Sequence, residues 1–246
     1  MKNWFENETF WSDMYPYMFN LDRLEDEGLQ IEQVIKLTGK RDGAVLDLCC
    51  GPGRHAVVFA KKGFKVTGVD RTPFLLEKAM KRAEEHEVEI EFVHEDMRSF
   101  IRKEAFDLIV NMYTSFGYFD SPGEDLQVLQ NMHENLKPEG KMIMDVVGKE
   151  TLARIYQPTH SEYFPDGALL VQRNEIIDSW MRVKSEWILV KDNKSISHTF
   201  YLNIYSAREL HDLFLQAGFS KVQIYGALNG EKYGLKASRL IIVASR

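Results

Sequence analysis

The fold is decided by residues 45–56, which read Val45-Leu46-Asp47-Leu48-Cys49-Cys50-Gly51-Pro52-Gly53-Arg54-His55-Ala56. The apolar run before Cys49 is typical of a buried strand, and the Gly-Pro-Gly segment ends it before a helix. Such a turn lets a ligand approach the backbone, and the N–H groups at the helix start attract an anion. Residues 51–56 also fit the GxGxxG/A dinucleotide pattern, which many nucleotide-binding α/β sheets satisfy.

Outward from this turn, residues 42–148 alternate short apolar runs with amphipathic stretches. The pattern predicts strands at 44–48, 65–70, 90–94, 106–111 and 142–147. Helices are expected to follow Gly53, to begin at Pro73 after Thr72, and to begin at a capping box formed by Ser121 and Glu124. Strands separated by helices at this rhythm form right-handed βαβ crossovers, so we expect a parallel sheet.

Residues 160–205 break this rhythm. Strands are expected at 180–190 and 196–205, joined by a hairpin turn at Asp192-Asn193, which indicates an antiparallel insertion. The βα pattern resumes with a capping box at Ser206 and Glu209, and strands are expected at 222–227 and 239–244. The expected fold is α/β, with a doubly wound, Rossmann-like, mostly parallel seven-stranded sheet and an antiparallel β insertion late in the chain. The predicted units are a ligand-binding domain at 41–159 and 206–246, the insertion at 160–205, and an N-terminal arm at 1–40.

The arm is acidic and aromatic. Its first 30 residues hold two basic and seven acidic side chains, a net charge of -5, together with seven aromatic residues. A disordered tail is not so rich in aromatics, so we expect a helical arm that folds against the rest of the chain. It is interpreted either as a lid over a ligand or as a helix packed on the outside of the sheet.

The composition excludes several classes of protein. The 246 residues are 44% hydrophobic and 28% charged, which is the balance of a folded domain rather than of a disordered or collagen-like chain. With 31 basic and 37 acidic residues the net charge is -6, and no basic block favours nucleic acid. The adjacent Cys49 and Cys50 are expected to be free thiols, and no signal peptide or membrane-spanning run is present, so we expect a cytoplasmic protein.

Three acids follow three successive strands: Asp47, Asp70 and Asp96. Because the carboxyl ends of parallel strands meet at one edge of the sheet, these acids should lie around one ligand. A pyrophosphate would be repelled there, whereas a ligand with a cationic head, a ribose diol and an adenine amine would be favoured. S-adenosylmethionine has these features, so we expect it to be the cofactor.

At these residues the sequence resembles the class I S-adenosylmethionine-dependent methyltransferases, over roughly residues 42–148. The resemblance implies that the glycine turn cradles the methionine part, that Asp70 binds the ribose hydroxyls, and that Asp96-Met97 meets the adenine. It also implies that Asn111 faces the transferring methyl group. The expected cofactor-binding residues are Asp47, Cys49, Gly51, Gly53, Arg54, Asp70, Arg71, Asp96, Met97 and Asn111. Cys49 departs from the family, which has glycine there, so the turn is expected to be slightly displaced.

The later part of the chain is similar to small-molecule methyltransferases with an antiparallel insertion, such as the amino-sugar N-methyltransferases. The resemblance, carried here by residues 111–119, implies a small-molecule acceptor. We expect its pocket to be formed by Trp11, Tyr15, Tyr17, Tyr113, Ser115, Phe116 and Tyr118, with the insertion at 160–205 as the opposite wall. Candidates for a general base are Tyr113, Tyr118 and His160, and no metal site is expected. The arm would cover the methionine end of the cofactor, and its acids favour a neutral or cationic acceptor.

Two other functions use the same turn. The chain could be an NAD-dependent oxidoreductase, or a binding protein that keeps the cofactor pocket without turnover. Comparing the binding of S-adenosylmethionine with that of NADH distinguishes a methyltransferase from an oxidoreductase. A methyl-transfer assay distinguishes a methyltransferase from a binding protein. The acceptor and its N or O atom are left open at this point, as is the choice between a monomer and a homodimer.

Overall fold

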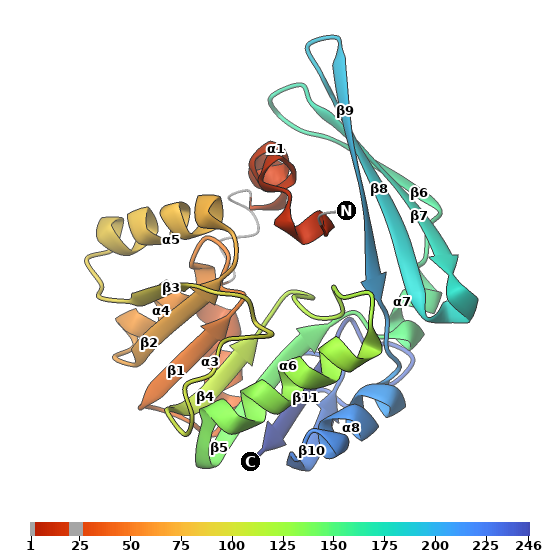
Figure 1. Cartoon of the computed structure of the whole chain (residues 1–246). Helices are drawn as coiled ribbons and strands as arrows, with labels where there is room; N and C mark the ends of the chain where they lie inside the picture. Colours follow the sequence, from red (N-terminus) through yellow and green to blue (C-terminus); the bar gives the residue numbers. More distant parts are fainter. Residues whose placement is uncertain (1–2, 20–26) are drawn as a thin grey trace.

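The computed structural model describes residues 3–19 and 27–246 (Figure 1). Its larger sheet consists of β1 (Ala44–Leu48), β2 (Lys65–Asp70), β3 (Glu91–His94), β4 (Phe106–Asn111), β5 (Leu136–Val146), β10 (Ser220–Tyr225) and β11 (Leu240–Ser245). The strand order is β10-β11-β5-β4-β1-β2-β3, and β11 runs antiparallel to both of its neighbours. The predicted mostly parallel seven-stranded sheet is confirmed.

The strands of this sheet are buried on both sides, because helices cover both of its faces. α3 (Glu27–Thr38) and α4 (Arg54–Lys61) share one core cluster with Val45 and Leu108, whereas α6 (Pro122–Asn135) and α8 (Ala207–Gln216) share the other with Leu46 and Ile109. Neighbouring strand residues thus serve opposite cores, as the alternation of side chains requires. α5 (Pro73–Glu85) lies beside α4 against β2 and β3. Within the described ranges, no helix has the length and apolar character needed to cross a bilayer.

Local signals place most of these elements. The capping boxes at Ser121 and Ser206 both form, and Pro73 is the first residue of α5. The expected strand at 142–147 is longer than predicted, because pairing begins where Leu136 meets Phe106 and passes through a register shift before Lys141. Glu139 takes a left-handed φ of 62° in this irregular part.

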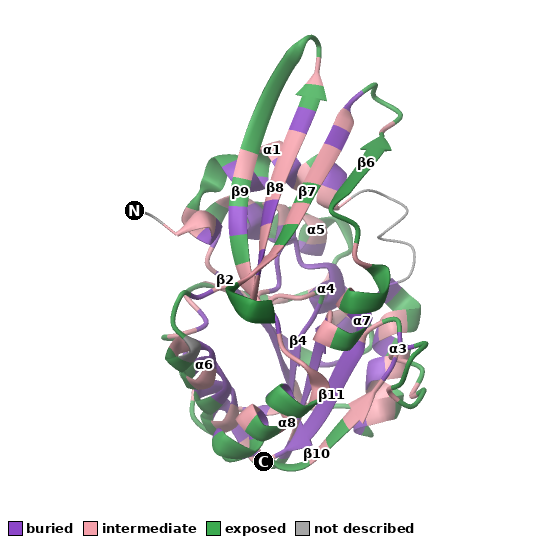
Figure 2. Cartoon of the chain, turned by 90° about the vertical axis from the view of Figure 1, so that its right-hand side faces the viewer, coloured by how far each residue is buried: buried purple, intermediate pink, exposed green. Residues whose placement is uncertain are grey.

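The insertion forms a separate antiparallel sheet. After α7 (Lys149–Ile155), its strands are β6 (Thr159–Tyr163), β7 (Leu169–Ile177), β8 (Arg182–Lys191) and β9 (Lys194–Asn203), in that order. The hairpin at Asp192-Asn193 forms with two positive φ angles, 50° and 58°, as a tight turn between twisted strands requires. Trp180 is not in a strand as expected, because the short helix η2 (Asp178–Trp180) has left-handed φ angles that end β7. β6, which Figure 2 shows as exposed, carries no apolar pattern.

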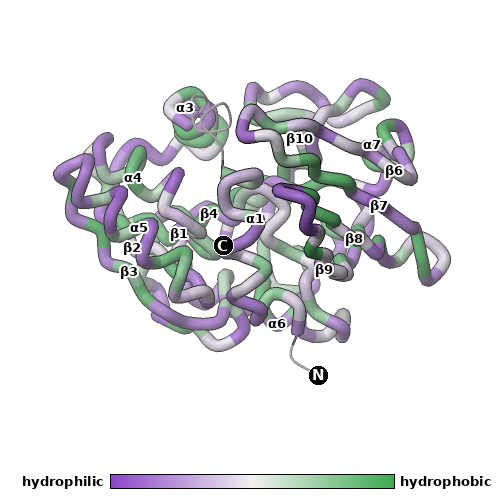
Figure 3. Tube along the Cα trace, turned by 90° about the horizontal axis from the view of Figure 1, so that it is seen from above, coloured by the Kyte–Doolittle hydropathy of each residue, from purple (hydrophilic) through white to green (hydrophobic). Residues whose placement is uncertain are grey.

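The arm divides into two parts. η1 (Trp4–Glu6) and α1 (Glu8–Met18) lie between the two sheets, above the carboxyl ends of the parallel strands (Figures 1 and 3). Its aromatic side chains pack on the insertion, with the rings of Trp4 and Phe200 5.0 Å apart. The second part, α3, packs instead against α4 and β5 as a layer of the parallel sheet. The segment between them, residues 20–26, lies outside the described residues.

Candidate functional site

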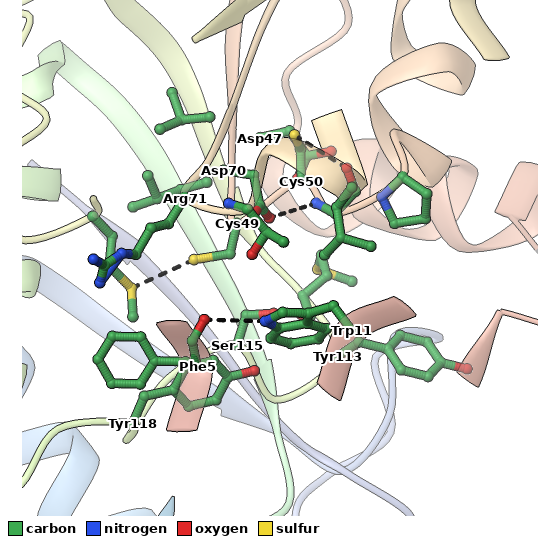
Figure 4. Close-up of a pocket in the computed structure, with 18 of the residues that line it drawn as sticks. Phe5, Trp11, Asp47, Cys49, Cys50, Asp70, Arg71, Tyr113, Ser115 and Tyr118 are labelled. Atoms are coloured by element: carbon green, nitrogen blue, oxygen red, sulfur yellow. Dashed lines mark hydrogen bonds between the residues drawn. The ribbon is translucent and has the colours of Figure 1, made fainter. Parts of the chain in front are cut away.

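A pocket opens at the carboxyl ends of β1, β2 and β4 (Figure 4). Open α/β sheets bind their ligands at this edge, where the loops after the strands meet. The walls are the turn after β1, the ends of β2 and β3, the loop after β4, and the N-terminal arm. Of the predicted site residues, those that line the pocket are Asp47, Cys49, Gly51, Arg54, Asp70, Arg71, Asp96, Met97, Trp11, Tyr113, Ser115 and Tyr118.

The turn after β1 brings the backbone close to the pocket through three left-handed residues. Cys49, Gly51 and Gly53 have φ angles of 64°, 53° and 77°. Cys49 therefore adopts the conformation that glycine favours, at the position where a glycine was expected. Its Sγ lies 3.4 Å from the Sδ of Met97, and burial raises the pKa of its thiol well above the usual value. Gly53, which was also expected to bind the cofactor, does not line the pocket. Packing requires a glycine there, because a Cβ atom would lie 3.2 Å from the backbone of Ala79.

Asp70 is fixed at the end of β2. Its Oδ2 accepts a hydrogen bond of 2.8 Å from the backbone N–H of Gly51, and its Oδ1 accepts one of 2.9 Å from Thr72. Burial raises the pKa of Asp70, and these hydrogen bonds oppose the shift. The hydroxyl of Thr72 and the backbone N–H of Arg71 also lower this pKa, so the carboxylate is held firmly at the edge of the pocket.

Asp47 has an unpaired oxygen. The side chain is 2% exposed, and its Oδ2 has no hydrogen-bond partner among the described residues. The pKa of Asp47 is raised from 3.8 to about 7, mainly by burial and also by the nearby charge of Asp70, while the N–H of Ala56 and the charge of Arg54 act against this shift. A buried carboxylate is costly without a donor or a cation. The site therefore fits a ligand that brings a positively charged hydrogen-bond donor to Asp47.

Asp96 is joined to two arginines. Its two oxygens accept three hydrogen bonds from Arg98, of 2.7 to 2.9 Å, and one of 3.3 Å from Arg71. Burial opposes the charge of Asp96, but the hydrogen bonds and charge of Arg98 outweigh it and lower the pKa. Arg71 also donates a 2.7 Å hydrogen bond to Glu6 of the arm. Arg71 thereby connects the arm to the strand ends.

Two further predicted cofactor residues lie at the margin of the pocket. Arg54 lines it, but its Nε donates a 3.1 Å hydrogen bond to Glu27, and its guanidinium stacks on the ring of Tyr113 at 4.6 Å. Asn111 is fully buried beneath the pocket rather than lining it. Its Nδ2 donates to the carbonyls of Leu48 and Ser115, so it ties the loop after β4 to β1.

The arm contributes a different set of side chains from the expected one. Trp11 lines the pocket and donates its indole N–H to the carbonyl of Phe5 at 3.0 Å. Tyr15 and Tyr17 do not line it, which corrects the expected wall. Tyr15 packs against Phe74 of α5, and the hydroxyl of Tyr17 donates to Asp166 of the insertion at 3.2 Å.

The sequence analysis missed three arm residues that line the pocket: Phe5, Met18 and Phe19. Helical spacing was the available signal for one of them. Met18 is seven residues after Trp11, so both lie on one face of α1, whereas Tyr17 points to another face. Phe5 and Phe19 lie outside α1, where spacing gives no guidance.

The general-base candidates are dispersed. Tyr118 lines the pocket, but burial raises the pKa of its phenol far above neutrality, so it keeps its proton. Tyr113 is 45% exposed, in a loop where it and Thr114 have left-handed φ angles of 61° and 64°. His160 and Phe116 lie outside the pocket, in the lining of a second cavity on the other side of this loop.

Comparisons with known proteins agree with this geometry. Residues 45–140, which include the glycine turn and all three acids, match the family model described as a methyltransferase domain. The chain carries a methyltransferase domain. The resemblance to S-adenosylmethionine-dependent methyltransferases is thus confirmed.

The relatives extend the match beyond the domain. A glycine/sarcosine N-methyltransferase of Halorhodospira halochloris is 25% identical over 88% of this chain and 78% of its own length. A Geobacillus protein provisionally named a methyltransferase is 34% identical, but the match covers 52% of each chain. The chain thus spans about half the length of that curated relative.

Solved structures share the whole fold. An S-adenosylmethionine-dependent methyltransferase from Clostridium acetobutylicum has a TM-score of 0.79 at 15% identity, covering 95% of this chain and 98% of its own. An amino pentose methyltransferase from Micromonospora echinaspora, solved with S-adenosylmethionine bound, has a TM-score of 0.71 at 19% identity, covering 96% of each chain. The similarity in fold therefore extends well beyond residues 45–140.

Proposed function

We propose that this protein transfers the methyl group of S-adenosylmethionine to a nitrogen or oxygen atom of a small molecule by in-line displacement. The observation that carries the proposal is the unpaired Oδ2 of Asp47, buried in the pocket beside the glycine turn. A cationic ligand would satisfy this atom, whereas a pyrophosphate would add negative charge beside Asp47 and Asp70. This argues against a nicotinamide dinucleotide.

The pocket residues have separate tasks in this proposal. Asp47 meets the ammonium group of the methionine part. Asp70, already oriented by the N–H groups of Gly51 and Thr72, accepts hydrogen bonds from the ribose hydroxyls. Met97 and the Asp96 segment border the adenine, with the carboxylate of Asp96 held by Arg98 and Arg71.

The bound cofactor supplies a methyl group that its sulfonium already activates. The protein therefore has to position the acceptor and exclude water, and holding two reactants in line can remove roughly 7 to 11 kcal/mol of barrier. The arm is suited to exclude water, because Phe5, Trp11, Met18 and Phe19 close the open side of the pocket. A neutral amine needs no general base, which agrees with the raised pKa of Tyr118.

Two assays test the proposal against its alternatives. S-adenosylhomocysteine should raise the melting temperature by mass action, and NADH should not. A larger shift with NADH would favour an oxidoreductase. Transfer of a labelled methyl group from S-adenosylmethionine into the small-molecule fraction of a cell extract should then occur. Cofactor binding without any transfer would identify a binding protein.

A further inference from the structure

A second cavity, of about 330 Å3, lies beside the cofactor pocket. The two share the loop after β4 as a wall: Met112, Tyr113 and Ser115 line the cofactor pocket, and Thr114 and Phe116 line the second cavity. The other lining residues come from the end of β5, from α7 and the two residues after it, from β6, β7, β8 and β9, and from residues 204–205. Its volume is in the range of small-molecule sites.

Among the described residues, no carboxylate, lysine or arginine lines this cavity; its lining includes the imidazole of His160, and Arg239 and Asp125 are hydrogen-bonded to the lining residues Thr114 and Tyr205. Half of its lining residues are phenylalanine or aliphatic, and none is Asp, Glu, Lys or Arg. An anionic or cationic ligand would lose its hydration there without gaining an ion pair. The cavity is therefore suited to a neutral molecule with an apolar body, unlike the charged cofactor pocket.

Three hydroxyl groups in the lining have already used their protons. Ser185 donates to Asn174 at 2.7 Å, Tyr156 donates to the carbonyl of the same Asn174 at 2.8 Å, and Tyr205 donates to the buried Asp125 at 2.5 Å. A hydroxyl that donates within the protein offers a ligand only its lone pairs. These three hydroxyls can thus accept hydrogen bonds from the N–H or O–H groups of a ligand, whereas the fourth lining hydroxyl, that of Thr114, accepts a hydrogen bond from Arg239 and keeps its own proton to donate.

The insertion leaves this part of its inner face for an occupant. Farther along the same face, Trp187 and Phe200 are covered by the arm through Phe10. The paired residues Val183 and Leu202 are not covered in this way and line the cavity instead. This uncovered apolar surface lies beside the proposed cofactor pocket, where a methyl acceptor has to bind.

We propose that this cavity holds the methyl acceptor, and that the acceptor is a neutral amine with an apolar body; this rests on the proposed function. A cavity whose described lining residues include no carboxylate favours the free base of an amine over its ammonium form, which leaves the lone pair available. The nitrogen lone pair forms the bond to the methyl carbon while the carbon–sulfur bond breaks, with its electrons remaining on sulfur. The methylated ammonium then releases a proton to water.

The shared wall is the point at which the two cavities would join. Tyr113 and Thr114 hold consecutive left-handed conformations, which are unfavourable for residues with a side chain. A change of this segment to ordinary φ angles would relieve that strain. We therefore expect the wall to move when both sites are filled.

Binding of a neutral fluorescent amine tests the cavity directly. N-phenyl-1-naphthylamine is apolar and uncharged, and 8-anilinonaphthalene-1-sulfonate is its sulfonated analogue. Val183→Phe fills the cavity and should weaken binding of the neutral probe by about tenfold or more. Lys184→Phe places the same ring on the opposite face of β8 and should change binding by less than about twofold. If Val183→Phe fails to fold, Leu202→Trp replaces it.

The affinity for S-adenosylhomocysteine separates this inference from the proposed function. Val183→Phe should keep that affinity, lose neutral-probe binding, and lose methyl transfer into the small-molecule fraction of a cell extract. Methyl transfer at the wild-type rate in Val183→Phe would overturn the inference. So would a wild-type protein that binds the sulfonated probe as tightly as the neutral probe, if Val183→Phe abolishes both. Failure of the wild-type protein to bind S-adenosylhomocysteine would instead overturn the proposed function.

Discussion

Replacement of Asp47 by asparagine should stabilise the ligand-free protein and weaken its cofactor binding. Burial raises the pKa of Asp47 from 3.8 to about 7, so the folded state holds this proton more tightly than the unfolded state does. The stability that the proton provides is complete below about pH 4 and is lost as the pH rises through about 7. A shift of about three pKa units corresponds to roughly 4 kcal/mol at most.

Asp47→Asn removes the charge and keeps the shape. At pH 8 and without ligand, we expect the variant to unfold at a higher temperature than the wild type, with about 2 to 4 °C for each kcal/mol recovered. Near pH 4 the two proteins should be alike. S-adenosylhomocysteine should bind the variant about tenfold or more weakly, because a hydrogen bond to a charged group is lost.

Thermal unfolding from pH 4 to 8.5, with and without S-adenosylhomocysteine, measures both effects. Asp107→Asn is the matched control: the carboxylate of Asp107 accepts hydrogen bonds from Lys137 and Ala44 outside the pocket, and these outweigh burial and lower its pKa. That variant should lose stability at pH 8 and keep its affinity for the ligand. If Asp47→Asn behaves as Asp107→Asn does, Asp47 is a structural acid and the reasoning is refuted.

Three further substitutions test the pocket, the arm and the turn. Asp70→Ala should raise the dissociation constant of S-adenosylhomocysteine by about 10- to 100-fold in calorimetry; an unchanged constant with a native circular dichroism spectrum would remove Asp70 from the site. Glu6→Gln breaks the partly exposed contact with Arg71, worth about 0.2 to 1 kcal/mol, and should speed ligand dissociation a few-fold in stopped-flow experiments. An identical rate would mean that this contact does not hold the arm. Cys49→Gly relieves a left-handed φ and should raise the free energy of unfolding by up to about 1 kcal/mol in urea, and a lower value would contradict strain at this residue.

The parallel sheet could be predicted because its signals are local. β1 and β4 are short apolar runs; the β1 run ends at the Gly51 turn, and β2 is followed by Thr72 and Pro73, which begin α5. Once parallel pairing is inferred, Asp47, Asp70 and Asp96 must meet at one edge, and all three line the pocket. This part of the site follows from the order of the strands alone.

The arm and the insertion could be predicted only in outline, because their contacts are distant in sequence. The direction of the Tyr17 side chain depends on Asp166, 149 residues away. Trp180 lies outside the strand because residues 178–180 have left-handed φ angles, which their residue types do not predict. β6 is polar and exposed, so its pairing with β7 leaves no alternating pattern. Long-range packing decides these features, and single-sequence periodicity does not register it.

The connection between the arm and β9 has a consequence for how the protein is made. The indole of Trp4 donates to the carbonyl of Tyr201, and Asp13 pairs with His198, across 197 and 185 residues of chain. A ribosome releases the first partner of each pair long before the second, and domains fold from their N-terminal end as they emerge. The arm must therefore wait, with its aromatic side chains unburied, until the insertion has been synthesised. In a nascent chain that stops before β9, we expect the arm not to cover the pocket. The arm should then be the segment most exposed to chaperones and proteases.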